Sequence, residues 1–187
     1  MALARLESLA EIEATVWREL AQAVRDKQHG WRVAVLATVD CEAADARSVV
    51  LRDLDEPTRT LLMYTDARSP KAAQLAAHPE GTLVLWSATL GWQLRLRVLL
   101  ALETSGLRVS SRWARLKLTP AAQDYLSPLP PGALLDVAAP EGVPERQSRE
   151  HFAVLAAQVQ SVDWLDLHPQ GHRRALFSAA GAAWITP

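Results

Sequence analysis

Apolar side chains recur in the first part of the chain with the spacing of a helix. The positions that would share one helix face are Leu9, Ile12, Val16, Leu20 and Val24. Ser8, followed three residues later by Glu11, forms a capping-box pattern at the start of this run. The pattern predicts a helix from about Ser8 to Lys27, ended by Gly30, that packs on the outside of a sheet.

After this helix the pattern changes to that of strands. Trp31–Val39 is rich in β-branched residues and predicts the first strand. Ala46–Leu54 predicts the next, a polar turn follows at Asp53–Arg59, and Thr60–Thr65 predicts a third strand. The stretch Ala46–Thr65 is therefore predicted to form a hairpin.

A short helix is predicted directly after this hairpin. Ser69 is a favoured N-cap, Pro70 is favoured at the first helical position, and Pro79 ends the helix after His78. The start of a helix offers free N–H groups and the positive end of its dipole, which suits a phosphate group. Lys71 adds a positive charge at the same place.

The rest of the chain alternates between short elements. Its predicted strands are Thr82–Ser87 and Gln93–Leu102 around Gly91, and three terminal strands at W-L-D-L, R-A-L-F and A-W-I-T. Its predicted helical segments are Ser111–Leu118, Thr119–Leu126 and, after a Pro-rich loop at Ser127–Pro144, Arg146–Gln160. Hairpins dominate, so the expected fold is mainly β with peripheral helices (α+β), a small antiparallel barrel. Residues 1–187 are expected to form a single domain.

Composition excludes several classes of protein. A net charge of −1 gives no overall attraction to nucleic acid or to a membrane surface. The single cysteine rules out an intrachain disulfide and a CxxC site, which fits a cytoplasmic protein. No apolar run reaches the roughly 18 residues of a membrane helix, and the first residues lack a signal-peptide pattern. Histidines at metal-ligand spacing, a nucleophile elbow, a P-loop and GxGxxG are missing, so we expect no metal site and assign no catalytic residue.

Positive charges and hydroxyl groups gather around the predicted hairpin and the helix start that follows it. They belong to Arg47, Arg52, Arg68, Lys71, Tyr64, Thr65 and Ser69. Because side chains alternate along a strand, Arg47 and Arg52 would lie on opposite faces, and only a bulge or the strand end could bring both to one ligand. The set suits a small anionic, planar ligand better than a polyanion, since the charge is local.

Together these residues resemble the pyridoxamine 5′-phosphate oxidase-like family of FMN-binding split β-barrels. R-S-V-V-L-R at Arg47–Arg52 is similar to the family's first FMN strand, and Y-T-D-A-R-S-P-K at Tyr64–Lys71 is similar to its phosphate segment. L-A-A-H-P at Leu75–Pro79 is similar to the family's helix end, and Gln93 follows at the expected interval. R-A-L-F and W-I-T-P near the C-terminus are looser matches to its closing strands.

The resemblance implies a homodimer that binds FMN at the interface between its subunits. Arg47, Lys71 and the Tyr64–Thr65 pair would hold the phosphate and ribityl groups, and Ser69 would cap the helix that faces the phosphate. Hydride chemistry would belong to the flavin, with the protein supplying position and electrostatics.

The resemblance also assigns residues to the flavin itself. Those that would lie along it, with backbone contacts, are Val49, Val50 and Leu51, followed by Arg52. Gln93 would hydrogen-bond the isoalloxazine region, and Arg174 would reach the flavin from the partner chain.

The chain departs from the oxidase itself at the substrate motifs. The family's Tyr-x-x-x-Arg-x-x-x-Ser segment has Ser111, Arg115 and Thr119 here, its Arg-x-His motif is replaced by G-H-R-R, and its W-x-S-x-Q-S segment by S-P-L-P-P-G. We therefore expect an FMN-dependent oxidoreductase of unknown small-molecule substrate. The alternatives are pyridoxamine 5′-phosphate oxidase itself, a non-catalytic flavin carrier or sensor, and a split barrel that has lost its ligand.

Overall fold

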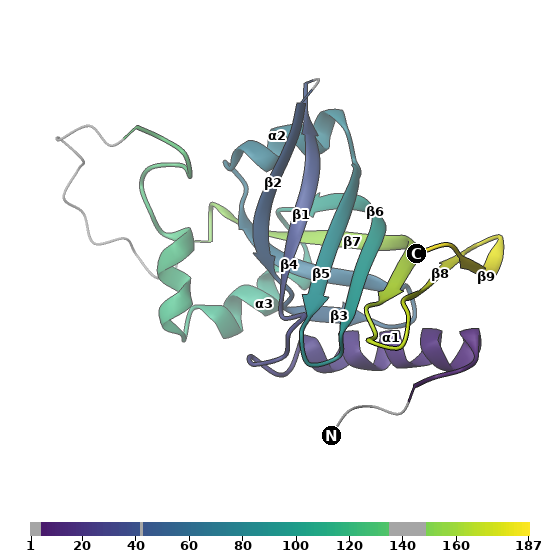
Figure 1. Ribbon diagram of the computed structural model, residues 1–187. Helices are drawn as coiled ribbons and strands as arrows, with labels where there is room; N and C mark the ends of the chain where they lie inside the picture. Colours follow the sequence, from purple (N-terminus) through teal and green to yellow (C-terminus); the bar gives the residue numbers. More distant parts are fainter. Residues whose placement is uncertain (1–4, 42, 135–148) are drawn as a thin grey trace.

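One curled antiparallel sheet carries most of the chain, with helices at its edges (Figure 1). The computed structural model describes residues 5–41, 43–134 and 149–187. The helices are α1 (Leu9–Ala23), α2 (Pro70–Ala77), α3 (Leu107–Leu116) and the 3₁₀ segment η1 (Pro120–Tyr125). The strands are β1 (Val33–Asp40), β2 (Ala43–Val50), β3 (Asp53–Asp55), β4 (Thr60–Asp66), β5 (Glu80–Ser87), β6 (Trp92–Glu103), β7 (Phe152–Asp166), β8 (Arg173–Ser178) and β9 (Gly181–Ile185).

The order of the strands explains why the sheet curls. They follow one another as β2-β1-β5-β6-β7-β4-β3, and the hairpin β8–β9 attaches to β7 as a branch. Strand β7 is 15 residues long. Its first half pairs with β4 and its second half with β8, while β6 runs along both halves. The two ends of the main path, β2 and the β4–β3 hairpin, therefore come round to the same side of the molecule (Figure 1).

Two apolar clusters fill the fold. The larger lies inside the curled sheet, where α1 closes one end with Ile12, Val16 and Leu20, all fully buried. The smaller lies under α3 and η1, around Phe152. The Phe152 ring lies 5.1 Å from Tyr64, 5.3 Å from Trp113 and 5.3 Å from Tyr125, measured between ring centroids. Phe152 thus ties β7, β4, α3 and η1 together.

The expected fold class is confirmed, and most elements fall where the pattern predicts them. Helix α1 has the full capping box of Ser8 and Glu11, α2 begins at Pro70, and β5 and β6 turn at Gly91, whose φ is +68°. Helix α3 begins earlier than predicted, at Leu107. In the described part of the chain, no helix is long and apolar enough to cross a membrane.

The helix predicted at Arg146–Gln160 is wrong, because residues from Phe152 onward form strand β7; positions 146–148 lie outside the described residues. The spacing of Phe152, Leu155 and Ala156 fits a helix, yet Phe152–Ala157 are all buried in a strand whose two faces are covered. A strand buried on both faces shows a continuous apolar run, which periodicity cannot tell from a buried helix. The predicted W-L-D-L strand is the end of the same element, which finishes at Asp166.

The hairpin predicted at Ala46–Thr65 is also wrong. Strand β2 pairs with β1, and β4 forms its hairpin with the short β3, which occupies part of the predicted polar turn. Strand β2 ends at Val50, so Leu51 and Arg52 bridge from one end of the sheet to the other. The sequence pattern identifies strands but not which strand each one pairs with, since pairing is decided by the closed sheet.

Replacing Phe152 with Ala is expected to lower the free energy of unfolding by about 3–5 kcal/mol, because it empties the centre of the smaller cluster. Phe152→Leu keeps most of the apolar volume and should cost less than about 1.5 kcal/mol. Leu107→Ala, at a side chain that is 84% exposed, should change stability by no more than about 0.5 kcal/mol. Denaturant titrations of the three variants measure these differences. Equal effects of Phe152→Ala and Leu107→Ala would contradict the role given to Phe152.

Candidate functional site

A cavity of about 210 Å³ lies where the two ends of the sheet face each other. Strand β2 forms one side, β4 forms the other, and Lys71 of α2 and Tyr125 of η1 close it. The residues proposed from the sequence that line this cavity are Arg47, Val49, Val50, Arg52, Tyr64, Thr65 and Lys71. The structure therefore brings seven of the eleven predicted residues to one place.

Among the described residues, strand edges on both sides of the cavity have no strand partner. Strand β2 is the last in the order of the sheet, and β1 is its one partner among the described strands. Strand β3 pairs with β4 at Thr60–Leu62, and no other described strand pairs with that edge of β4. An unpaired edge directs every second N–H and C=O outward, where a ligand can form hydrogen bonds with them.

Lys71 supplies the positive charge at one end of the cavity. Its Nζ donates hydrogen bonds to Thr65 Oγ1 at 2.9 Å and to Ser69 Oγ at 3.1 Å. Burial, and secondarily the nearby Arg47 guanidinium, lower the pKa of the Lys71 ammonium. In the described residues, no carboxylate lies within ion-pair distance of this ammonium, so an anionic ligand would be its closest counter-charge. Ser69 is buried and does not cap α2, since its hydroxyl is directed at Lys71 and Thr65 instead.

Arg47 is held by a network on the β1–β2 side of the cavity. It forms an ion pair with Asp45 and donates to Gln74 Oε1 at 2.8 Å and to Thr38 Oγ1 at 2.5 Å. Gln74 comes from α2 and Thr38 from β1. The Arg47 side chain is 20% exposed and lines the cavity.

Arg52 and two tyrosines form the other end of the cavity. The Arg52 guanidinium carbon lies 5.5 Å from the centre of the Tyr64 ring, and Tyr125 lines the same cavity. Burial raises the pKa of Tyr125 to about 12, and it also raises the pKa of Tyr64. Both phenols therefore stay protonated at neutral pH and can donate hydrogen bonds. Arg52 reaches the cavity because strand β2 ends at Val50, before this residue. The end of the strand, rather than a bulge, thus brings Arg47 and Arg52 to the same cavity.

Five lining residues were missed by sequence reasoning. Ser48 lies on β2, Met63 on β4 and Leu155 on β7, while Asp124 and Tyr125 come from η1. The sequence indicates a short helical segment at Thr119–Leu126 but carries no motif for a ligand there. Tertiary contacts, such as the packing of Tyr125 against Phe152, place this segment at the cavity.

The structure does not bring four predicted residues to the wall of this cavity. Leu51 is fully buried in the larger cluster. Its backbone N–H donates a hydrogen bond to the Arg32 carbonyl at 3.0 Å. Ser69 contacts the site through Lys71 and Thr65. Gln93 lies on β6 and Arg174 on β8, away from the cavity.

Gln93 and Arg174 share the outer face of the sheet. Gln93 is opposite Leu165, and Leu165 is opposite Arg174, so the three side chains lie in one row. Trp86, opposite Gln93 on β5, continues the row and is 47% exposed. Arg174 forms a bidentate ion pair with Asp163, in which Nε donates to Oδ1 at 2.8 Å and Nη2 donates to Oδ2 at 2.7 Å.

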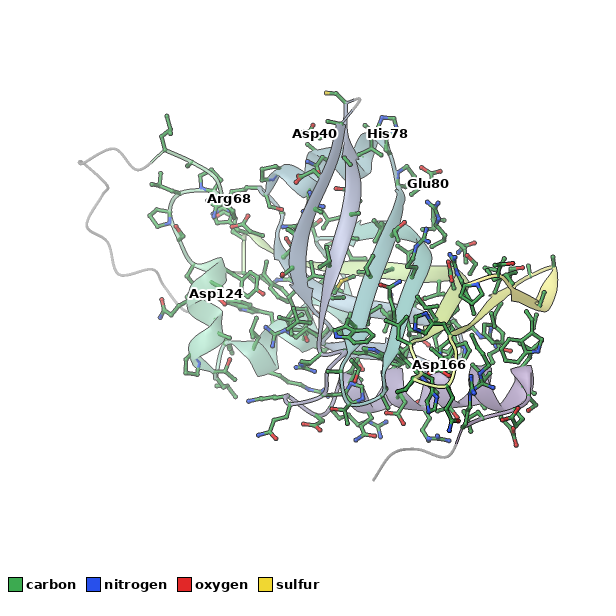
Figure 2. All side chains as sticks on the ribbon, in the orientation of Figure 1. Asp40, Arg68, His78, Glu80, Asp124 and Asp166 are labelled. Carbon is green, nitrogen blue, oxygen red and sulfur yellow. The ribbon has the colours of Figure 1, made fainter. Side chains whose placement is uncertain are left out.

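Arg68 does not line the cavity, although the sequence pattern groups it with the positive charges of the predicted ligand site. Its guanidinium pairs with Asp66 and donates to the backbone carbonyls of Ser127 at 2.9 Å and Pro128 at 3.1 Å. It therefore fastens the segment after η1 to the start of α2, on the side of the molecule where Figure 2 also shows Asp124.

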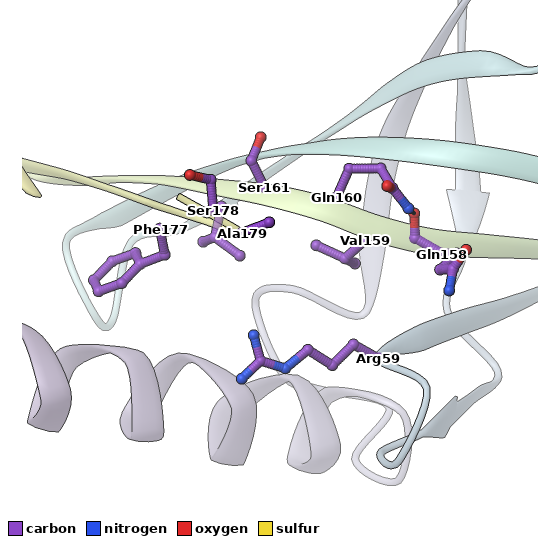
Figure 3. A pocket seen from close by; sticks show the side chains of 9 residues that line it. Arg59, Gln158, Val159, Gln160, Ser161, Phe177, Ser178 and Ala179 are labelled. Carbon is purple, nitrogen blue, oxygen red and sulfur yellow. Dashed lines mark hydrogen bonds between the residues drawn. The ribbon is translucent and has the colours of Figure 1, made fainter. Parts of the chain in front are cut away.

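Two further cavities contain none of the predicted residues. One, of about 260 Å³, is lined by Arg59 and by residues of β7 and the end of β8, with Arg59 reaching toward α1 (Figure 3). The other, of about 420 Å³, lies between the β1–β2 turn and α2 and includes Cys41 and His78. Within residues 5–41, 43–134 and 149–187, no three His, Cys, Asp or Glu side chains are grouped closely enough to hold a metal ion.

Comparison with known proteins shows which family part of the chain matches. Residues 14–102 match the family model described as the pyridoxamine 5′-phosphate oxidase FMN-binding domain. The chain is 25% identical over 177 residues to a pyridoxine/pyridoxamine 5′-phosphate oxidase of Caulobacter vibrioides, covering 89% of this chain and 79% of that protein. A relative of the same name from Azorhizobium caulinodans is 38% identical over 79 residues, which cover 42% of this chain and 36% of the relative.

Solved structures show the same fold. A pyridoxamine 5′-phosphate oxidase-related, FMN-binding protein of Nostoc punctiforme superposes with a TM-score of 0.73 at 24% identity, over 97% of this chain and 100% of that one. PhzG of Burkholderia lata, in complex with tetrahydrophenazine-1-carboxylic acid, also has a TM-score of 0.73, at 14% identity, over 100% of this chain and 99% of PhzG. These likenesses confirm the split barrel, and the family match indicates FMN as the cofactor. Residues 14–102 thus match the FMN-binding domain of the pyridoxamine 5′-phosphate oxidase family, and the chain is similar over most of its length to relatives and solved structures of that family.

Proposed function

We propose that the chain binds FMN in the cavity between β2 and β4 and acts as an FMN-dependent oxidoreductase on a small molecule. The observation that carries this proposal is Lys71, a half-buried ammonium whose hydrogen bonds go to two hydroxyl groups. A phosphate group is the kind of ligand that such a site fits, because it supplies the missing negative charge and accepts several hydrogen bonds.

The residues of the cavity fit the parts of FMN in order. Lys71, Arg47 and the start of α2 would hold the phosphate, as cations and helix N–H groups do elsewhere. The hydroxyls of Tyr64 and Thr65 would bond the ribityl chain. The open edge of β2 at Val49 and Val50 would offer backbone groups to the flavin.

We further propose that two copies of the chain complete the site. A cavity of about 210 Å³ is small beside the ~300–1,000 Å³ of ordinary cofactor sites, so it can enclose only part of FMN. The outer face of the sheet exposes Val33 (50%), Val35 (43%) and Trp86 (47%), and a second copy packed there would bury them. Gln93 and Arg174 lie on this same face, where the partner of a homodimer would present them to the flavin.

FMN, when bound, would supply the hydride-transfer chemistry. The contribution of this chain would be to bind, orient and exclude water. Tyr64 and Tyr125 would act as neutral hydrogen-bond donors, since burial raises the pKa of each phenol. Arg52 would add a positive charge at the end of the cavity away from Lys71.

Pyridoxamine 5′-phosphate oxidase activity is the second candidate, favoured by the names of the relatives. Ser111 is its main difficulty, because this exposed residue of α3 stands where the family's substrate motif has a tyrosine. A non-catalytic flavin carrier is the third candidate.

Lys71→Ala is expected to weaken FMN binding by about 1.5–3 kcal/mol, because it removes a charge-assisted contact with the phosphate. Arg47→Ala should have an effect of similar size. Flavin fluorescence quenching measures the affinity, and riboflavin, which lacks the phosphate, should bind both variants much as it binds the wild type. Lys117→Ala, at the end of α3, is the matched control. Unchanged FMN affinity in both cavity variants would refute the proposed site.

Sedimentation is expected to show a dimer that Val35→Glu dissociates, because the substitution puts a charge on the outer face of the sheet. The dissociated variant should also bind FMN more weakly, since the partner's contribution is lost. Leu107→Glu changes an exposed leucine on α3 and should leave the dimer intact. A wild-type monomer that binds FMN tightly would contradict this proposal.

The bound flavin is expected to be reduced by NADH or NADPH and reoxidised by oxygen or a quinone, which its absorbance spectrum would follow. If every donor leaves the flavin oxidised, the carrier alternative holds and the enzyme proposal fails. Formation of pyridoxal 5′-phosphate from pyridoxamine 5′-phosphate is the separate test of the second candidate.

A further inference from the structure

We propose that Asp45 is a built-in counter-ion of the phosphate-binding end of the cavity, holding Arg47 in place and limiting the affinity of the site for anions. The inference rests on the proposed FMN site and assigns to this carboxylate a role in setting how tightly, and with what salt dependence, that site binds. Asp45 acts through Arg47 and is therefore a positioning residue.

The geometry around Asp45 is a closed set of hydrogen bonds. Asp45 Oδ2 accepts from an Arg47 Nη2 and from Gln74 Nε2, the latter at 2.8 Å. Gln74 Oε1 in turn accepts from Arg47 Nη2 at 2.8 Å and from Thr38 Oγ1 at 2.7 Å. Asp45 and Arg47 are alternate residues on β2, so their side chains leave the strand on the same face. Arg47 is thus held between a carboxylate and an amide.

Gln74 links this network to Lys71. Both residues lie on α2, three positions apart and thus on neighbouring turns of one helix face. Gln74 is only 6% exposed, so its amide has few positions available and fixes the distance between α2 and β2. The negative charge of Asp45 also acts on Lys71, where it raises the pKa of the ammonium against the larger opposing effects of burial and Arg47.

Asp45 therefore has two opposite effects on an incoming phosphate. Its hydrogen bonds keep Arg47 and α2 in position, which favours binding by reducing the ordering that the ligand must impose. Its charge repels the phosphate and offsets part of the positive charge of Arg47 and Lys71. The Asp45 side chain is 42% exposed, so water and salt screen the repulsion and its effect is modest.

Two substitutions at one position separate these effects. Both hydrogen bonds to Asp45 end on the same oxygen, Oδ2, so the single carbonyl oxygen of Asp45→Asn can accept both while the charge is removed. Asp45→Ala removes the charge and the hydrogen bonds together. Asp40→Asn makes the same change of charge at the other end of the β1–β2 turn and serves as the control.

The experiment is a titration of the flavin-free protein with FMN and with riboflavin, at low and at high ionic strength. Asp45→Asn should bind FMN about two- to fivefold more tightly than the wild type at low salt, the range expected for an exposed charge pair. Its FMN affinity should also fall more steeply with salt, because more positive charge is left uncompensated. Riboflavin affinity should be unchanged, and Asp45→Ala should bind FMN more weakly than Asp45→Asn.

Each other outcome overturns a defined part of the proposal. FMN affinity of Asp45→Asn equal to or below that of the wild type, or an equal gain for riboflavin or for Asp40→Asn, would refute the counter-ion role. Equal affinities of Asp45→Asn and Asp45→Ala would refute the holding role. If Lys71→Ala weakens FMN binding but Asp45→Asn changes nothing, the proposed FMN site survives and only this inference fails. If the wild type does not bind FMN, both fail together.

Discussion

The pairing of strand β7 is the constraint on which the rest of the structure depends. One long strand pairs with β6 along its length, with β4 through its first half and with β8 through its second half. This double use of one strand brings β4 round to face β2, and the gap left between them is the candidate site. A closed barrel would have satisfied both strand edges and left no backbone groups to offer a ligand.

The site combines fixed elements from both ends of the sheet. Lys71 and Gln74 come from α2, Arg47 from the edge strand β2, and Tyr125 from a segment that Phe152 and Arg68 hold in place. Two charged groups of the site contact a neighbour that does not itself line the cavity: Arg47 is bonded to Gln74, and Lys71 is bonded to Ser69. Such support lowers the ordering cost that a ligand must meet on binding.

The electrostatics of the cavity are balanced rather than uniformly positive. Asp45 pairs with Arg47, and Asp124 and Arg52 both line the cavity. Two buried phenols keep their protons and contribute hydrogen bonds without charge. This arrangement suits a ligand with a strongly anionic group and a larger neutral part, since the Lys71 ammonium donates its hydrogen bonds to hydroxyl groups and an anion would give it a counter-charge.

The sequence by itself determined the local elements and one half of the site. Helix capping at Ser8, the helix start at Ser69–Pro70, and the close run from Arg47 to Lys71 are local features, because capping, turn chemistry and strand alternation act between near neighbours. Tertiary structure alone decided the strand nature of Phe152–Gln160, the pairing of β2 with β1, and the arrival of Asp124 and Tyr125 at the cavity. It also decided that Gln93 and Arg174 share one row on the outer face of the sheet. These features depend on contacts between residues far apart in the chain, and a buried central strand has no period that the sequence could reveal.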